Sequence, residues 1–470
     1  MTAGPIIAID PTLCTGCGRC AAVCPVGAVS GPDGQAKTID AARCVLCGQC
    51  VQLCAAFAAP FDEPPHDVAA ICRERGRPET AGPVFAAYSR CDLAAAQALA
   101  ADASKVAMVQ CAPAVRVTLA EEFGLPPGTL TPGKLAAALR RLGFAAVYDT
   151  TFAADVTIME ESAELLSRLD SGAALPLFTS CCPAWVRHVE TAWPKLIPHL
   201  SSCKSPQQMA GALFKSYAAA LDGIDPARVA SLSVMPCTAK KYEAARPELR
   251  SREAGLADVD VVLTVAELAV WLKEAGIDLP GLPDEPFDAP LGRYSGAGVI
   301  FGGSGGVMEA ALRTAVAVVD GGAACAPQSG IVFEPAGPGL SRAEFTLGGR
   351  ALAAVVVNGL ANAAPLLAAV AEGRADFQFM EVMCCPGGCV AGGGTPKLLP
   401  GVDVAAAVAA RREALSCHDR ELPVRMSHEN PAVVQLYAAF LEKPLSHRSH
   451  ELLHTVYGGA GQGRGEEGQD

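Results

Sequence analysis

The sequence lacks the features that bring a protein to nucleic acids or carry it through membranes. Its 470 residues contain 37 Lys and Arg against 49 Asp and Glu, giving a net charge of -12 and no basic run that could neutralise a phosphate backbone. Nucleic acid is therefore not an expected partner. The amino-terminal segment MTAGPIIAIDPT has no basic region, no long apolar run and no twin-arginine pair, so we expect no export signal and a cytoplasmic location.

An uninterrupted hydrophobic run of membrane-spanning length is also missing. The one uncharged stretch long enough, residues 351–371, is broken by Asn358, Gly359, Asn362 and Pro365. We interpret it as a strand, an Asn-Gly turn and a helix, and we expect no contact with a membrane. Charged residues make up 18% and the AVILMFWYC group 51%, which excludes a disordered chain.

Cysteine, in contrast, is abundant. The chain has 20 cysteines, and clustered cysteines in a reducing cytoplasm hold metal more often than they form disulfides. Eight of them form two runs of the bacterial ferredoxin pattern, Cys14-x2-Cys17-x2-Cys20-x3-Cys24 and Cys44-x2-Cys47-x2-Cys50-x3-Cys54.

In this pattern the fourth cysteine of each run reaches the other cluster. We therefore predict one 4Fe-4S cluster on Cys14, Cys17, Cys20 and Cys54, and a second on Cys44, Cys47, Cys50 and Cys24. Structural zinc is the alternative, but eight cysteines in doubled spacing fit a four-cysteine site poorly. Two adjacent clusters relay single electrons, which implies a catalytic centre elsewhere in the chain and a redox partner outside it.

From Lys105 onward, short apolar runs alternate with longer amphipathic ones. The expected strands are 106–110, 145–148, 175–179, 229–235, 259–263, 352–357 and 377–381, and the expected helices are 134–142, 154–169, 183–192, 264–275 and 359–372. This alternation predicts an α/β fold with mainly parallel sheets, in which ligands bind beyond the carboxyl ends of strands. Cysteines follow four of these strands, at 111, 181/182, 237 and 385.

The expected domain order has five parts. It comprises a ferredoxin-like α+β domain (1–60), a linker (61–104), a two-lobed α/β catalytic domain (105–400), a helical extension (401–457) and a disordered tail (458–470).

Three segments resemble the signature motifs of iron-only (FeFe) hydrogenases: TSCCPAW (179–185), MPCTAKKYE (235–243) and EVMCCPGGCVAGGGTP (381–396). The resemblance covers the chain from about residue 105 to its end. It implies an H-cluster, a 4Fe-4S cubane bridged to a two-iron unit that carries carbon monoxide, cyanide and a dithiolate. By motif position the ligands are Cys182, Cys237, Cys385 and Cys389, with Cys389 as the bridge. Thiolates are soft ligands suited to such clusters.

The resemblance also implies roles for groups beside the cluster. Cys181 exchanges protons with the two-iron unit, and the path continues through Glu161, Glu164 and Ser201, with Arg168 near its outer end. Spacing alone would favour a solvated ion pair on the helix that carries residues 161, 164 and 168.

Four further residues are expected around the two-iron unit. Lys240 donates hydrogen bonds to a cyanide ligand, Met235 and Met383 pack beside the unit, and Gln207 lines the same pocket. Lys241 is expected to face water.

The other cysteines and the tail histidines are interpreted as structural. Cys111, Cys203 and Cys384, like Cys72, Cys91, Cys325 and Cys417, are expected to act as small hydrophobes. His447, His450 and His454 would share one helix face, but no acid or cysteine sits at ligand spacing beside them. The tail instead resembles the small subunit of two-chain members of the family, fused here, with hydrogen-bonded histidines that anchor it.

The resemblance implies reversible interconversion of hydrogen with protons and electrons, coupled to ferredoxin or a similar small carrier and dependent on maturation proteins. Two alternatives remain. Relatives in cytosolic iron-sulfur assembly lack the full TSCCP and MPCxxK motifs, and hydrogen-sensing relatives carry signalling extensions that this sequence does not show. Ala184 stands where the family has glycine or cysteine, so we expect no built-in protection from oxygen.

Overall fold

The structure is a computed structural model that describes residues 4–59, 67–79, 82–251, 255–320, 331–398 and 401–458. Cys325 and residues 459–470, which form nearly all of the expected disordered tail, lie outside the described residues.

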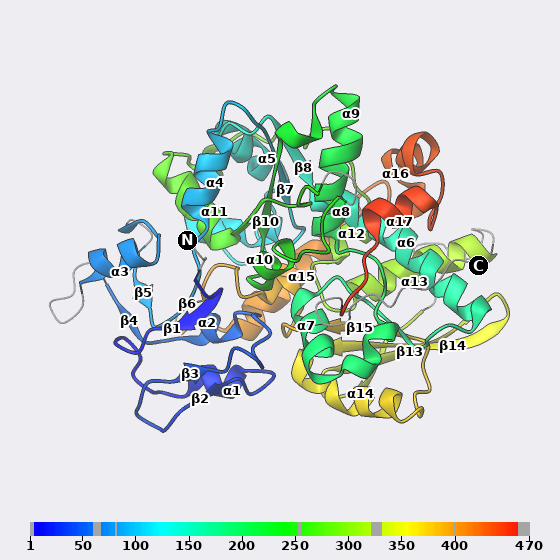
Figure 1. Cartoon of the computed structure of the whole chain (residues 1–470), viewed down its shortest axis with the longest axis horizontal. Coiled ribbons are helices and arrows are strands. Elements are labelled where there is room, and N and C mark those ends of the chain that lie inside the picture. The colour runs from blue at the N-terminus through cyan, green and yellow to red at the C-terminus, as the bar shows by residue number, and fades with distance from the viewer. Residues whose placement is uncertain are drawn as a thin grey trace.

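The amino-terminal unit, at the lower left of Figure 1, is built around two short helices. Helices α1 (Arg19–Val23) and α2 (Gln49–Leu53) each follow a glycine in the left-handed conformation, Gly18 at φ 76° and Gly48 at φ 74°. Strand β2 (Val29–Ser30) pairs with β3 (Thr38–Ile39) beside them. This repeated turn and helix matches the doubled cysteine motif.

Residues of the expected linker complete this unit. Strand β1 (Ile7–Ile9) pairs with β6 (Ala87–Ser89), and β4 (Phe57–Ala58) pairs with β5 (Val84–Phe85), with α3 (Val68–Glu74) between them in sequence. A domain boundary at residue 60 would separate β1 from β6 and β4 from β5. Strands β5 and β6 therefore belong to the amino-terminal unit, because they pair with strand edges that would otherwise be open.

The first large sheet has four strands, all parallel. Its order is β11 (Val261–Thr264), β10 (Val229–Met235), β7 (Val106–Cys111) and β8 (Ala146–Asp149). Helices α4 (Leu93–Ala100), α5 (Pro132–Arg141) and α11 (Val265–Glu274) pack on it through one apolar core. Both faces of the sheet are covered, as is usual for parallel strands.

The second large sheet is mixed. Its order is β12 (Glu334–Gly337), β13 (Leu340–Leu347), β14 (Arg350–Asn358), β15 (Phe379–Met383) and β9 (Leu177–Phe178). The strands β14, β15 and β9 are parallel, whereas β12 and β13 add an antiparallel meander that the sequence did not predict.

The uncharged stretch 351–371 forms β14, a short 3-10 turn and α14 (Ala364–Ala371), so its interpretation as strand, turn and helix is confirmed. Within the described residues no helix is long and apolar enough to cross a membrane.

A layer of helices joins the two sheets. The longest is α6 (Thr150–Ser171), accompanied by α8 (Pro206–Leu213), α12 (Gly296–Ile300) and α13 (Gly306–Asp320). Shorter helices are α7 (Pro183–Ala192), α9 (Ala219–Leu221) and α10 (Ala239–Ala244).

The helical carboxyl-terminal extension comprises α15 (Val404–Glu421), α16 (Pro431–Leu436) and α17 (His447–Leu453), and Figure 1 shows the last two beside α6. Asp155 of α6 anchors it, since its carboxylate accepts hydrogen bonds from Ser427 and Asn430 at 2.7 and 2.9 Å. The expected fold class is therefore confirmed, with one sheet mixed.

Candidate functional site

Two cavities in the amino-terminal unit are each lined by four cysteines. The first contains Cys14, Cys17, Cys20 and Cys54, and the second Cys24, Cys44, Cys47 and Cys50. The fourth cysteine of each run thus lies with the first three of the other run. Backbone N–H groups point at some of these sulfurs, for example Ala28 N to Cys24 Sγ at 3.2 Å and Ala87 N to Cys54 Sγ at 3.3 Å.

A third cavity lies where β9, β10 and β15 end. Its lining includes the cysteines Cys181, Cys182, Cys237, Cys384, Cys385 and Cys389, together with Met235, Met383, Lys240 and Gln207. All of them except Gln207, which lies in α8, come from the three motif segments, and parallel strands deliver these segments to one place because their carboxyl ends share an edge. Cys111 is not part of this lining; it is buried at the end of β7 near Asp149 and Arg116.

The sulfurs in this third cavity influence one another. Burial and then the neighbouring Cys385 raise the pKa of Cys182 to about 11. Burial and then Cys182 and Cys385 raise the pKa of Cys389 to about 12. Burial and the same neighbours also raise the pKa of Cys237. Four unpaired thiols that face one space fit a soft metal cluster, which would be the partner that makes their ionised forms stable.

Lys240 is a buried cation at the cavity wall. Its ammonium group donates to the Cys181 carbonyl at 3.0 Å and to the Glu243 carboxylate at 2.9 and 3.1 Å. Burial opposes its charge, but Glu243 outweighs burial and raises the pKa of Lys240. Glu243 also accepts from Gln207 Nε2 at 3.0 Å, which fixes that side chain at the cavity.

The expectation for Lys241 was wrong. Its side chain is buried, with the residue only 3% exposed, and its ammonium group is 2.7 Å from Glu267 and 3.1 Å from Asp92. Helix α10 is covered on both sides, so neither of its lysines faces water.

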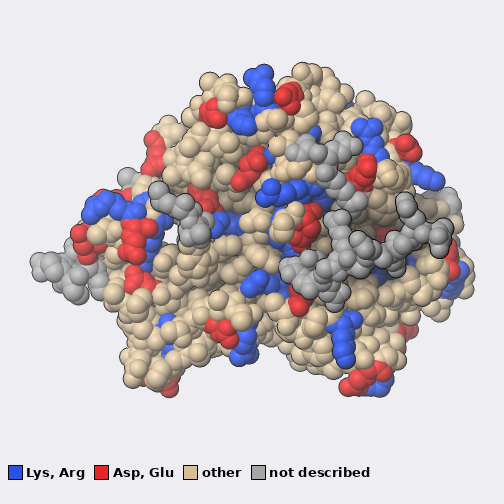
Figure 2. Space-filling view, in the orientation of Figure 1, with Lys and Arg blue, Asp and Glu red and all other residues tan. Residues whose placement is uncertain are grey.

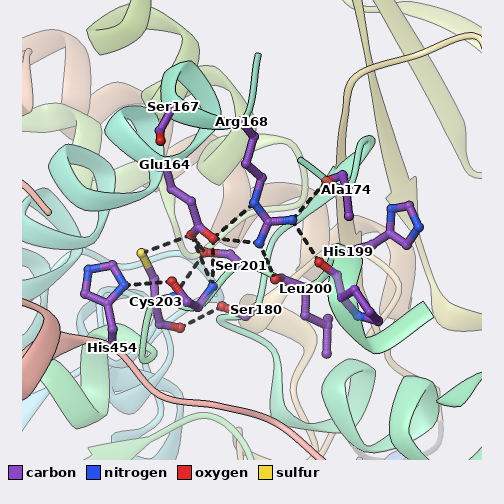
Figure 3. A network of polar contacts seen from close by, with 12 residues as sticks. Glu164, Ser167, Arg168, Ala174, Ser180, His199, Leu200, Ser201, Cys203 and His454 are labelled. Atoms are coloured by element: carbon purple, nitrogen blue, oxygen red, sulfur yellow. Dashed lines mark hydrogen bonds and ion pairs between the residues drawn. The ribbon is translucent and has the colours of Figure 1, made fainter. Parts of the chain in front are cut away.

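Polar side chains extend from Glu161, near the cavity thiol Cys181, to Arg168, and Figure 3 shows the outer part of this line, from Ser201 through Glu164 to Arg168. The Ser201 hydroxyl donates to Glu164 at 2.7 Å and also contacts the carboxyl group of Glu161. The Arg168 guanidinium lies 2.7 Å from Glu164 at the outer end. The line brings together all the residues of the expected path, because α6 places residues 161, 164 and 168 on one face.

Glu161 is the most perturbed carboxyl of this line. Burial, followed by repulsion from Glu164, raises its pKa to about 8. The charge of Glu161 in turn contributes to the raised pKa of the Cys181 thiol, after burial. A carboxyl group that titrates near neutral pH, next to a thiol, can both accept and release a proton.

Comparison with protein families identifies three regions. Residues 105–393 match the model described as "Iron only hydrogenase large subunit, C-terminal domain". Residues 405–459 match "Iron hydrogenase small subunit", and residues 6–55 match "4Fe-4S dicluster domain". The chain belongs to the iron-only hydrogenase family. Its cofactors are accordingly two 4Fe-4S clusters and the H-cluster.

Individual relatives agree with this membership. The NADP-reducing hydrogenase subunit HndD of Solidesulfovibrio fructosivorans is 48% identical over 365 residues, which are 76% of this chain and 61% of that protein. Iron hydrogenase 1 of Clostridium pasteurianum is 41% identical over 359 residues, 75% of this chain and 61% of that protein. The chain therefore spans about three fifths of the length of these relatives.

A solved structure and a more distant relative are also similar to the chain. An apo form of the [FeFe]-hydrogenase HydA1 from Chlamydomonas reinhardtii, in a variant, has a TM-score of 0.70 and 41% identity over 78% of this chain and 98% of its own. The cytosolic iron-sulfur assembly component 3 of Bos taurus is 32% identical over 377 residues, 78% of this chain and 77% of that protein.

The second and third hydrogenase motifs contact the ferredoxin-like unit beside its second cysteine cavity. Thr238 Oγ1 donates to the Leu46 carbonyl at 2.7 Å, and Gln49 Nε2 donates to the Ala391 carbonyl at 2.9 Å. Gly393 is required at this contact, because a Cβ there would lie 2.4 Å from the Cys47 carbonyl oxygen. The glycines of the third motif thus allow close approach of two backbones.

Two of the three tail histidines lie together, since the ring centroids of His450 and His454 are 4.4 Å apart. His454 follows the end of α17, and its ring contacts Ser202 Oγ at 2.8 Å and Glu160 at 3.1 Å. The expectation that hydrogen bonds anchor this tail is met at His454, whereas His447 is exposed.

The sequence did not predict that Cys203 and His454 lie beside Glu164, nor that Glu243 pairs with Lys240. The ligand atoms of Glu164, Cys203 and His454 all lie within 4.8 Å of one another, at the side of the polar line. Glu243 could have been found from its helical spacing to Lys240. No local signal marks His454 or Cys203, because their partners are distant in sequence.

Proposed function

We propose that this protein interconverts hydrogen with two protons and two electrons. The observation that carries the proposal is the convergence of the three motif segments, with Cys181 and Lys240, on one buried cavity. The assembly and sensing functions are the alternatives. The closer likeness to proteins named hydrogenases favours turnover over assembly.

The proposed H-cluster ligands are Cys182, Cys237, Cys385 and Cys389, with Cys389 as the bridging ligand. The proposed ligands of the two other clusters are the four cysteines of each ferredoxin cavity. When bound, the H-cluster supplies the coordination position at which hydrogen is exchanged. Met235 and Met383 would supply soft, apolar contacts around it.

Proton supply is proposed to run along Cys181, Glu161, Ser201 and Glu164, ending near Arg168. The Ser201 hydroxyl lies between two carboxyl groups, so it can pass a proton by donating to one while accepting from the other. Arg168 fixes the outer carboxylate by an ion pair. Lys240, which forms an ion pair with Glu243, would place its own positive charge beside the anionic H-cluster.

Electrons are proposed to pass through the two ferredoxin clusters from ferredoxin or a similar small carrier. Acidic and basic side chains are interspersed on the face in Figure 2, which offers no large basic patch for a polyanion.

Maturation proteins would install the two-iron unit. We propose a cytoplasmic location, a reducing compartment in which clustered cysteines hold metal more often than they form disulfides.

Replacement of Cys181 by alanine tests the catalytic proposal. Because Cys181 is proposed to transfer protons and to bind no iron, Cys181→Ala should keep its iron content and its carbonyl and cyanide infrared bands but lose turnover. Cys111→Ala, at a buried cysteine that is not part of the cavity lining, is the matched control and should retain activity. Loss of the infrared bands in Cys181→Ala would make this residue structural instead.

A truncation tests the electron route. Residues 1–89 should be removed rather than 1–60, because β5 and β6 pair with strands of the amino-terminal unit. Hydrogen evolution with a protein carrier should be lost, while evolution with reduced methyl viologen stays measurable. Unchanged rates with ferredoxin would show that electrons enter elsewhere.

A further inference from the structure

Cys384 lies between two of the cysteine cavities. It lines the third cavity beside Cys385, is 2% exposed and packs with Cys47 in one buried core, so that its thiol is placed to hydrogen-bond with the sulfurs of both Cys47 and Cys385. Its backbone N–H also donates to the sulfur of Cys182. The expectation that Cys384 is a small hydrophobe therefore does not describe its contacts.

The two partners of this thiol belong to different cluster sites. Cys47 lines the second ferredoxin cavity, and Cys385 lines the third cavity. The surroundings are apolar and include Val45 and Ala239 of one buried core cluster. A hydrogen bond is stronger in such surroundings than in water, because the local dielectric is low.

Hydrogen bonds to the sulfurs of an iron-sulfur cluster are one of the factors that set its reduction potential. Reduction adds one electron to the cluster and makes its thiolate ligands more negative. A donor that points at such a thiolate therefore stabilises the reduced form. No bond is formed or broken in this step, and the proton stays on the donor.

We propose that Cys384 is a shared hydrogen-bond donor that raises the reduction potentials of the clusters held by Cys47 and Cys385. The proposal rests on the ligand sets given under Proposed function. The thiol has one proton, so it can serve either partner and favour whichever cluster holds the electron. Cys384 is thus a positioning residue between the electron relay and the catalytic centre, and it binds no iron.

The test is a redox titration followed by electron paramagnetic resonance. The full chain is produced without maturation proteins, so that only 4Fe-4S clusters are present and activity plays no part in the readout. Three proteins are compared with the wild type: Cys384→Ala, Cys384→Ser and Cys111→Ala. Alanine keeps the backbone N–H that faces Cys182 and removes only the thiol, whereas serine restores a donor.

In Cys384→Ala the reduction equilibrium of at least one cluster should shift by about tenfold toward the oxidised form, a fall of ~59 mV for one electron. The cluster of Cys14, Cys17, Cys20 and Cys54 should keep its potential, because Cys384 does not contact those residues. Cys384→Ser should restore most of the shift, and Cys111→Ala should match the wild type.

Two results would overturn the proposal. One is a Cys384→Ala protein with full iron content in which all cluster potentials equal those of the wild type. The other is the same fall in potential in Cys111→Ala. If the wild-type protein holds no 4Fe-4S clusters, the ligand sets fail instead, and iron analysis separates that outcome from the first two.

Discussion

Glu161→Gln is the substitution that most cleanly tests the proposed proton path. The pKa of Glu161, raised by burial and by Glu164 to about 8, leaves about ten protonated molecules for each ionised one at pH 7. A neutral glutamine therefore replaces a carboxyl group that is already mostly neutral. The substitution should remove the transferable proton with little change in charge at this buried position.

The expected effect follows from the position of Glu161 between the thiol of Cys181 and the hydroxyl of Ser201. A positioned acid or base contributes ~10²–10⁴-fold to a rate, so hydrogen evolution should fall by about that factor. The assay uses saturating reduced methyl viologen, with iron content and infrared bands checked in the same preparation. Glu381→Gln is the comparison: burial also raises the pKa of Glu381, to about 7, but this residue lies outside the proposed path and only contributes, after burial and Glu164, to the raised pKa of Glu161, so its loss of activity should be much smaller.

Hydrogen evolution within twofold of the wild type in Glu161→Gln, with clusters intact, would refute the path. An equal loss in Glu381→Gln would also count against it, because the loss would then follow from any change to a buried carboxyl group near the cavity.

The other predictions concern stability and docking. Burial and Glu164 raise the pKa of Glu161 above its usual 4.5, so the stability that its neutral carboxyl group gives the folded state is fully present below about pH 4.5 and is lost as the pH rises through about 8. Across that window the free energy of unfolding of Glu161→Gln should therefore rise by a few kcal/mol relative to that of the wild type, which a comparison of melting temperatures at several pH values would show. Glu164→Gln should destabilise the protein by about 3–5 kcal/mol, because both carboxylate oxygens accept hydrogen bonds and the buried ion pair with Arg168 is broken; an unchanged melting temperature would contradict this. Gly393→Ala should cost about 1–3 kcal/mol and slow electron delivery from a protein carrier, since the new Cβ would meet the Cys47 carbonyl, whereas Gly303→Ala, where the nearest atom is 3.7 Å away, should do neither.

The sequence predicted the elements that carry strong apolar periodicity. The strand expected at 229–235 is β10 to the residue, and the helix expected at 183–192 is α7. Helix α6 starts earlier than expected, at Thr150, because Asp149 caps it by accepting from Thr151 N. Strand β12 was missed because its residues are exposed, and β13 because polar residues interrupt its apolar ones, so that neither shows an apolar run.

The candidate site also has a part that the sequence predicted and a part that it did not. Motif residues could be placed from their spacing, since each segment brings its own cysteines to the end of a strand. Contacts between distant segments could not be predicted. The Cys47–Cys384 contact is an example, because the two residues belong to different units that are brought together by contacts such as that of Gly393 with Cys47.

The arrangement of the second sheet supports the proposal that protons and electrons reach one cavity by separate routes. Strands β9 and β15 are parallel neighbours, paired at Leu177 with Phe379. Each strand is followed by two adjacent cysteines, 181/182 and 384/385. On the proposed ligand set, the second cysteine of each pair binds the cluster and the first does not.

The two remaining thiols face different surroundings. Cys181 lies near Glu161, at the inner end of the polar line, whereas Cys384 contacts Cys47 of the ferredoxin-like unit. On the proposed routes, one pair would connect the cavity to proton donors and the other to the electron relay. Because the strands are hydrogen-bonded neighbours, their spacing fixes both connections relative to the cluster, and a shift in the register of β9 against β15 would disturb both routes at once.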